Sequence, residues 1–132
     1  MTDCPFCRLD PAADLLAAGP WAAIRDRYPV SPGHTLLVPR RHLVSFLELD
    51  EAERGSVAEC LHGIMARLQA EFAPDGFNVG INDGPAAGQT VMHLHVHVIP
   101  RYDGDVADPR GGVRGVIPDR TAYWDAADGS GE

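Results

Sequence analysis

Polar and apolar residues alternate strictly between positions 92 and 98, and every polar position in this stretch is a histidine. Side chains on a strand point alternately to its two faces, so the alternation predicts a strand with all of these histidines on one face. A helix would scatter the rings, because residues two apart do not share a helical face. The histidines of this row are His93, His95 and His97, and Leu94, Val96 and Val98 are expected to face the core.

Three other stretches are predicted to form strands. Residues 21–25 and 34–39 are short, mostly apolar runs, and a proline stops the second one. Residues 77–82 alternate with period two, which directs Phe77, Val79 and Ile81 inward. Between the first two runs, the sequence Tyr-Pro-Val-Ser-Pro-Gly is typical of a loop.

One long helix is predicted between the second and third of these strands. Asp50 is placed to cap its N-terminus, and Glu53 stands at the capping-box position three residues later. Apolar residues then recur at helical spacing until the sequence Pro74-Asp75-Gly76 ends the helix. Residues 9–18 are expected to hold a short helix, which stops before the following Gly-Pro pair.

Length and composition predict a single domain covering residues 1–132, with its core in residues 4–101 and an irregular C-terminal segment, 102–132. The formal net charge of −8 argues against non-specific nucleic-acid binding, which needs a basic surface. No run of eighteen apolar residues exists and the first residues do not resemble a signal peptide, so no membrane association and a cytoplasmic location are expected. Three cysteines, an odd number, fit a reducing compartment better than a disulfide framework.

The histidine row is the strongest indication of function. It contains half of the chain's six histidines. A solvent-exposed polar face is the simplest explanation for one histidine on a strand, but threonine, lysine or glutamate would serve solubility better. Imidazole can act near neutral pH as a nucleophile, a proton carrier or a metal ligand. The row therefore predicts a functional site.

A second candidate site begins with the pair Cys4 and Cys7. Two thiols at this spacing can hold one zinc ion, which prefers four cysteine or histidine ligands. The same spacing is also found in redox pairs and in idle thiols, so the pair needs further ligands to indicate a metal site. His42, at the exit of the second predicted strand, is a candidate third ligand.

Two irregular regions have alternative interpretations. Residues 83–89 form either a simple connection rich in small residues or a loop whose backbone N–H groups bind an anion. In the C-terminal segment, Arg110, Arg114 and Arg120 pair with the chain's own acids or reach the outer phosphates of a ligand. Tyr123 and Trp124 are candidates to cover the site or a partner, and residues 125–132 are expected to be a frayed acidic tail.

The motifs together resemble the histidine triad (HIT) proteins. Residues 93–99 have the form His-φ-His-φ-His-φ-φ, where φ is an apolar residue. The resemblance extends to residues 31–42 and 82–90 and to the N-terminal cysteine pair. It implies an α+β fold, in which a five-stranded antiparallel sheet packs against one long helix, with one short helix in addition. It also implies a homodimer whose two sheets join into one ten-stranded sheet.

The resemblance implies nucleotide chemistry at the α-phosphate, with roles for particular residues. His95 would be the nucleophile, His97 would hold the phosphate oxygens or assist the leaving group, and His34 would complete the imidazole relay. Cys4, Cys7, His42 and His93 would bind a structural Zn²⁺. The implied nucleotide contacts are Asp26 on the ribose, Phe6 and Leu9 around the base, and Asn82, Gln89 and Thr90 near the phosphate; Asn78 is a weaker addition.

The expected activity is hydrolysis of nucleoside phosphoramidates or dinucleoside polyphosphates to a mononucleotide such as AMP, through a covalent nucleotidyl-histidine. The favoured substrate is a purine nucleotide, with adenosine preferred. Capture of the intermediate by phosphate would instead make the enzyme a transferase or phosphorylase. A nucleotide sensor or adaptor with little turnover is the main alternative, although a pure binder would not need His95. A zinc-stabilised scaffold leaves His95, His97 and His34 unexplained.

Overall fold

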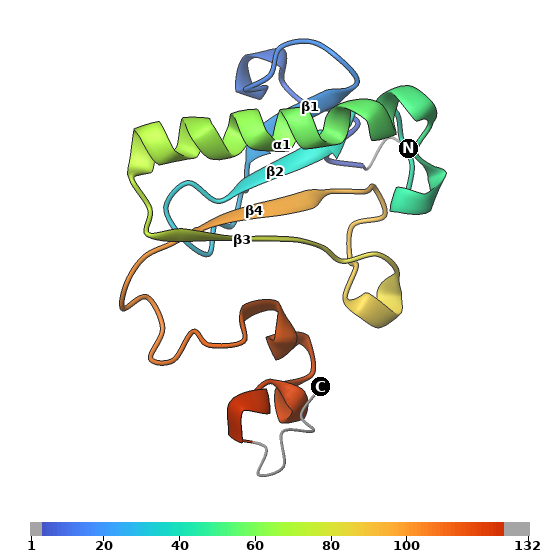
Figure 1. Cartoon of the computed structure of the whole chain (residues 1–132). Coiled ribbons are helices and arrows are strands. Elements are labelled where there is room, and N and C mark those ends of the chain that lie inside the picture. The colour runs from blue at the N-terminus through green and yellow to red at the C-terminus, as the bar shows by residue number, and fades with distance from the viewer. Residues whose placement is uncertain (1–3, 126–132) are drawn as a thin grey trace.

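The computed structural model describes residues 4–125 and contains one antiparallel sheet with the strand order β1-β2-β4-β3. The strands are β1 (Trp21–Arg25), β2 (Thr35–Pro39), β3 (Gly76–Ile81) and β4 (Val96–Arg101), and the long helix is α1 (Glu51–Phe72). Figure 1 shows α1 lying across one face of the sheet. The α+β fold is therefore confirmed, but the described residues supply four strands rather than five.

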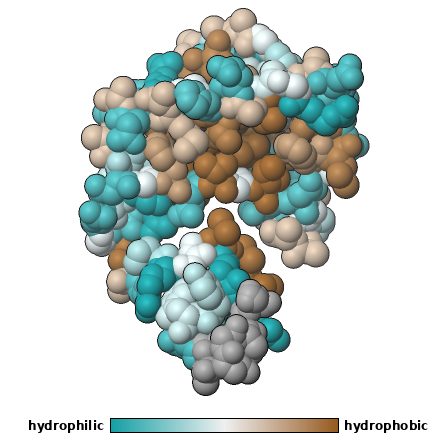
Figure 2. Space-filling view, in the orientation of Figure 1, coloured by the Kyte–Doolittle hydropathy of each residue, from teal (hydrophilic) through white to brown (hydrophobic). Residues whose placement is uncertain are grey.

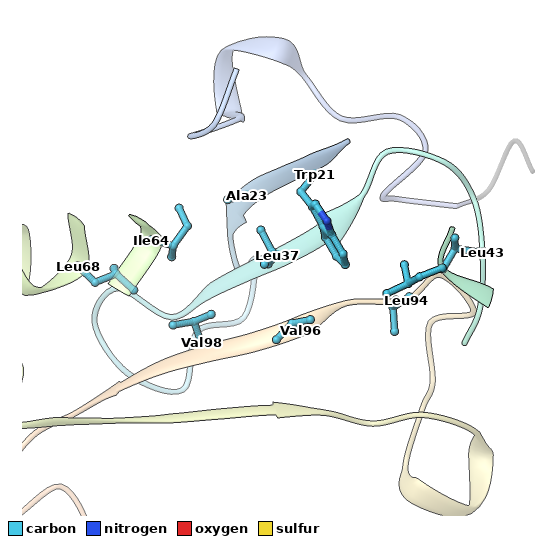
Figure 3. Close-up of a cluster of buried hydrophobic side chains, with 10 residues drawn as sticks. Trp21, Ala23, Leu37, Leu43, Ile64, Leu68, Leu94, Val96 and Val98 are labelled. Atoms are coloured by element: carbon cyan, nitrogen blue, oxygen red, sulfur yellow. The ribbon is translucent and has the colours of Figure 1, made fainter. Parts of the chain in front are cut away.

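The main core lies between α1 and the sheet (Figure 3). It takes alternate residues from each strand, including Trp21, Leu37 and Val98, and packs them against Ile64 and Leu68 of the helix. The indole of Trp21 donates a hydrogen bond to the backbone carbonyl of Glu53, 3.0 Å away, and so attaches the sheet to the first turn of α1. Because this face is filled by apolar residues, the alternate side chains are directed to the opposite face, where the candidate site lies.

The long helix matches its prediction closely. The side chain of Asp50 accepts from the backbone N–H of Glu53, and the side chain of Glu53 accepts from the backbone N–H of Asp50. The helix ends at Phe72, where Ala73 adopts a left-handed conformation before Pro74. No helix within residues 4–125 is long and apolar enough to cross a membrane.

Two predictions about local structure need correction. Residues 9–18 contain only a 3₁₀ turn, Pro11–Ala13, because the Asp14 carboxylate accepts from the backbone of Leu16 and Ala23 and turns the chain into β1. The last strand begins at Val96 rather than Met92. Before Val96, the backbone N–H of Leu94 donates to the carbonyl of Leu43 in the loop after β2.

The segment after β4 contains three short 3₁₀ helices, Gly112–Val116, Pro118–Arg120 and Tyr123–Asp125. Figure 1 shows this segment on the β3 side of the sheet, away from α1. Arg110 pairs with Asp108 and stacks on Trp124, and Arg114 donates to backbone carbonyls and stacks on Tyr123. These two arginines are thus held by their own segment. The expected tail, apart from Asp125, lies outside the described residues.

Candidate active site and metal site

A cavity of about 680 Å³ opens on the face of the sheet opposite α1. This size is typical of sites for small ligands. Its walls come from five parts of the chain: the N-terminal segment, the end of β1 with the loop after it, β2, the loop before β4, and the histidine row. His34, His95 and His97 all line it. The alternation from His95 into β4 explains the placement of His95 and His97, because Val96 and Val98 point into the main core.

Backbone groups decide which nitrogen of each ring carries a hydrogen. Nδ1 of His95 lies 2.9 Å from the carbonyl of His93, and a carbonyl only accepts, so Nδ1 is the protonated nitrogen. In the neutral ring, Nε2 therefore keeps its lone pair and is the nitrogen available to the cavity. The ring is 9% exposed, so it is both held in place and accessible from one side.

His34 and His97 form a second pair of oriented rings. The backbone N–H of Val30 donates to Nδ1 of His34, which leaves the hydrogen on Nε2. That nitrogen lies 3.0 Å from Nδ1 of His97 and 3.3 Å from the carboxylate of Asp26. When His34 donates to His97, the remaining hydrogen of the neutral His97 ring is on Nε2. His97 then presents an N–H donor, which suits an anionic oxygen.

Burial keeps this pair of rings neutral. Loss of water lowers the pKa of His34 below its ordinary value, and the carboxylate of Asp26 only partly opposes this effect. Burial also lowers the pKa of His97, and the neighbouring rings of His95 and His34 lower it further. Ligand atoms of Asp26, His34 and His97 lie within 4.8 Å of one another, but Nε2 of His34 carries a hydrogen and has no lone pair for a metal.

The second cluster consists of the four side chains expected to bind zinc. Ligand atoms of Cys4, Cys7, His42 and His93 all lie within 4.8 Å of one another. Nδ1 of His93 is 3.3 Å from the Cys4 sulfur, 3.6 Å from the Cys7 sulfur and 3.2 Å from Nδ1 of His42. A tetrahedral zinc ion would set such ligand-to-ligand distances at about 3.3–3.8 Å. The arrangement therefore fits a four-ligand ion.

The surroundings of the cluster also suit a metal. Nε2 of His93 donates to the carbonyl of Pro39, 2.8 Å away, so the lone pair on Nδ1 is directed at the other three ligands. Loss of water and the neighbouring Cys4 thiol raise the pKa of Cys7. Two sulfurs so close together would ionise more readily around a cation. With four protein ligands, such a site has no open position for chemistry.

Only some of the residues expected to contact a nucleotide line the cavity. Phe6, Asp26, Asn82 and Thr90 line the cavity. Leu9 packs behind it, in a small apolar cluster with Ala22, Leu36 and Val38, and also with Phe6 and Ile24. The carboxylate of Asp26 accepts from the backbone of Tyr28 and lies near His34, so it borders both the cavity and the ring pair.

Gln89 was expected near the phosphate, but its side chain is bound to backbone groups instead. Its side chain is buried and accepts from the backbone N–H of Gly84. Its amide nitrogen donates to the carbonyls of Val44 and Val91. As placed, Gln89 holds the loop 84–91 in shape. Asn78 is not among the residues that line this cavity, and its side-chain oxygen accepts a hydrogen bond from Arg101.

Sequence reasoning missed the arginines of the cavity. Arg8, Arg25 and Arg27 line its walls, although the chain as a whole is acidic. Arg25 is tied to Thr35 and Glu71. Arg8 and Arg27 are exposed and flank the cavity from the N-terminal segment and the loop after β1. Their clustering depends on the approach of two distant segments, which the sequence pattern alone does not reveal.

Comparisons with known proteins agree on the family. The model of the HIT domain matches residues 13–104. An uncharacterised HIT-like protein of Mycoplasma genitalium is 38% identical over 81 residues, which are 61% of this chain and 57% of that protein. Bis(5'-adenosyl)-triphosphatase of Saccharomyces cerevisiae is 39% identical over 105 residues, 78% of this chain and 48% of the yeast protein. The chain thus spans only about half the length of these two relatives.

The solved structures give the same result over nearly the whole chain. The crystal structure of a Zn-bound histidine triad family protein from Mycobacterium smegmatis superimposes with a TM-score of 0.70 and 30% identity. The match covers 94% of this chain and 96% of that protein. On the histidine row, the fold and these matches, the chain belongs to the histidine triad (HIT) family.

Proposed function

We propose that the protein is a nucleotide hydrolase that attacks the α-phosphate of nucleoside phosphoramidates or dinucleoside polyphosphates and releases a mononucleotide such as AMP. The observation that carries the proposal is the hydrogen bond from Nδ1 of His95 to the carbonyl of His93. It orients the imidazole so that, in the neutral form of the ring, the lone pair on Nε2 is available to a cavity of nucleotide size. The similarity to the yeast bis(5'-adenosyl)-triphosphatase supports the same reaction class.

In the first step, the lone pair on Nε2 of His95 forms a bond to the α-phosphorus, and the bond from phosphorus to the leaving group breaks. Nε2–H of His97 donates a hydrogen bond to the phosphate oxygens or to the departing atom, and the departing oxygen or nitrogen takes its proton from water, because a neutral imidazole does not release its remaining hydrogen. N–H donors around the phosphate stabilise the charge that develops on its oxygens. This splits one difficult displacement into two easier ones.

In the second step, water attacks the phosphorus of the nucleotidyl-histidine. The bond between phosphorus and Nε2 of His95 breaks, the attacking water loses its proton to solvent, and the mononucleotide leaves. Capture by inorganic phosphate in place of water would make the enzyme a phosphorylase. His34 keeps His97 in the tautomer that donates, because its own Nδ1 is fixed by Val30.

The proposal includes the assembly and the metal. Zinc held by Cys4, Cys7, His42 and His93 would stabilise the fold and would leave the chemistry to the histidines. Thiol ligands of this kind suit the reducing cytoplasm, where we place the protein. We also propose a homodimer. If the sheets of two copies join, the described strands would make eight rather than ten.

The test is a turnover assay with a panel that contains an adenosine phosphoramidate, diadenosine polyphosphates and an adenylyl sulfate. The wild-type protein should release AMP, and His95→Ala should reduce the rate about a thousandfold or more. His62→Ala is the matched control, because His62 is exposed on α1. Equal rates for His95→Ala and the wild type would refute the mechanism. Tight AMP binding without turnover on any substrate would indicate a sensor instead.

A further inference from the structure

The N-terminal segment, residues 4–9, contributes both to the cluster of metal ligands and to the wall of the cavity. Cys4 and Cys7 belong to the metal cluster, whereas Cys4, Pro5, Phe6 and Arg8 line the cavity. Phe6 lies between the two sulfur ligands in the sequence. A change in the position of this segment would therefore alter both sites together.

Phe6 contacts the key ring of each site. Its ring centroid lies 5.7 Å from that of His93, edge to face at 83°, and 5.2 Å from that of His95 at 57°. The ring of His97 also lies 5.1 Å from that of His95. The imidazole of His95 therefore contacts both Phe6 and His97. Its Nδ1 donates a hydrogen bond to the carbonyl of His93.

The segment has few other attachments to the body of the protein. Within the described residues, the only backbone hydrogen bond of residues 4–9 joins Cys7 to Cys4, inside the segment itself. Its other contacts include those of the two sulfurs with His42 and His93, the ring contacts of Phe6 with His93 and His95, and the packing of Phe6 and Leu9 on the small apolar cluster. Thiols are weak hydrogen-bond partners, so without a cation the sulfur contacts hold the segment poorly.

We infer that Phe6 is a positioning residue that couples the two sites: metal held by Cys4, Cys7, His42 and His93 fixes Phe6 against the ring of His95, so that metal and nucleotide bind cooperatively. The inference rests on the proposed function, because it requires a nucleotide in the cavity. Coupling of this kind is reciprocal. The nucleotide must raise the affinity for metal by the same factor as metal raises the affinity for the nucleotide.

The experiment measures both directions of the coupling on the full chain. Zinc affinity is determined by competition with a chelator, with and without saturating AMP. AMP affinity is determined by calorimetry on zinc-loaded and zinc-stripped protein. In the wild type, each ligand should tighten the binding of the other by about tenfold, within the usual range for coupled sites.

Substitutions at Phe6 distinguish coupling through the position of its ring from coupling through unfolding of the metal-free chain. Phe6→Ala should bring the coupling factor down to about one, while zinc affinity in the absence of AMP stays within about threefold of the wild type, because the four ligands remain. Phe6→Tyr keeps an aromatic ring at the position and should restore most of the coupling. If the coupling arose from unfolding of the metal-free chain, it would persist in Phe6→Ala.

The outcomes distinguish this inference from the proposed function. Equal AMP affinities for zinc-loaded and zinc-stripped wild type would overturn the inference but not the hydrolase, and so would full coupling in Phe6→Ala. No measurable binding of AMP to zinc-loaded wild type would count against the proposed function itself. The expected pattern is reciprocal coupling in the wild type and Phe6→Tyr, and none in Phe6→Ala.

Discussion

Two backbone carbonyls and one backbone amide decide the state of the rings in this site. Pro39 and His93 each accept from a ring nitrogen, of His93 and His95 respectively, and Val30 donates to His34. The alternating sequence predicts which side chains share a face, because the period of a strand is two. It cannot predict the tautomers, because the backbone partners are brought to the rings by the fold. Pro39 lies 54 residues from His93 in the sequence, and Val30 reaches His34 only because the loop between them turns back. Hydrogen placement is a property of the folded chain.

The neutral rings of His34 and His97 make the stability of the protein depend on pH. Burial lowers the pKa of both below the ordinary value of 6.5, so below that value the unfolded chain binds protons more readily than the folded chain. Their contribution is complete above about pH 6.5 and is lost as the pH falls through the lowered values. We expect the free energy of unfolding of the metal-free protein, measured with urea, to fall between pH 7 and pH 5.

The variant His97→Asn tests the source of this pH dependence. It should lose less stability than the wild type over the same pH range, because one of the rings whose pKa is lowered by loss of water is gone. His62→Asn, at an exposed position of α1, should follow the wild type. Equal slopes for His97→Asn and the wild type would show that the pH dependence comes from other groups.

At the scale of elements, capping residues and hydrophobic spacing predicted a helix or strand correctly where no tertiary contact opposed them. The capping box at Asp50 and the helical spacing after it predicted α1 correctly. The same reasoning was wrong for residues 9–18, where the carboxylate of Asp14 binds the backbone of β1 instead of supporting a helix. It also placed the start of β4 too early, because Leu94 pairs with the loop after β2. Both errors come from partners distant in the sequence.

The turn before β2 requires glycine at position 33. Gly33 has a φ of +88°, and a Cβ there would lie 2.9 Å from the ring of Phe72 at the end of α1. Gly33→Ala should lower the free energy of unfolding by about 2–4 kcal/mol, from backbone strain and the clash together. Gly19→Ala is the matched control: its φ is +89°, but it has nothing within 4 Å of the added Cβ. Similar losses in urea unfolding for both variants would refute the clash.

The first turn of α1 fastens the loop that carries His42. The buried carboxylate of Glu53 accepts from Arg41, 2.8 Å away, and from the backbone N–H of Asp50. Glu53→Ala should lower the free energy of unfolding by about 1–2 kcal/mol, because it removes the capping box and leaves Arg41 without this partner. Chemical denaturation should show little change for Glu59→Ala, an exposed glutamate of the same helix. Equal stability of Glu53→Ala and wild type would contradict this role.

At the scale of the whole molecule, the sheet separates the hydrophobic core from the candidate functional sites. One face carries the core beneath α1, and the other carries the cavity and the metal cluster. The sequence motifs predicted the histidines and cysteines that the fold brings together, but not that Arg8, Arg25 and Arg27 line the cavity in a chain of net charge −8. Those residues come together only through the fold. Their signal in the sequence is no stronger than that of any surface arginine.

The C-terminal segment and its surroundings bear on the proposed homodimer. Val116 and Ile117 are exposed at 78% and 57%, and Figure 2 shows hydrophobic residues both on this segment and on the neighbouring face of the body. Apolar surface of this kind is often covered by a partner. Sedimentation should give twice the chain mass of 14.2 kDa. Replacing both residues with aspartate should weaken association about tenfold or more, and a wild type that stays at the chain mass at all concentrations would refute the dimer.

The central claim, that Nε2 of His95 forms a bond to the α-phosphorus, is tested most directly by the stereochemistry of the reaction. A substrate with a chiral α-phosphorothioate is hydrolysed in isotopically labelled water, and the configuration of the released nucleotide is determined. Two successive in-line displacements, one by His95 and one by water, predict overall retention of configuration at phosphorus. Inversion would mean a single direct attack by water and would contradict the account.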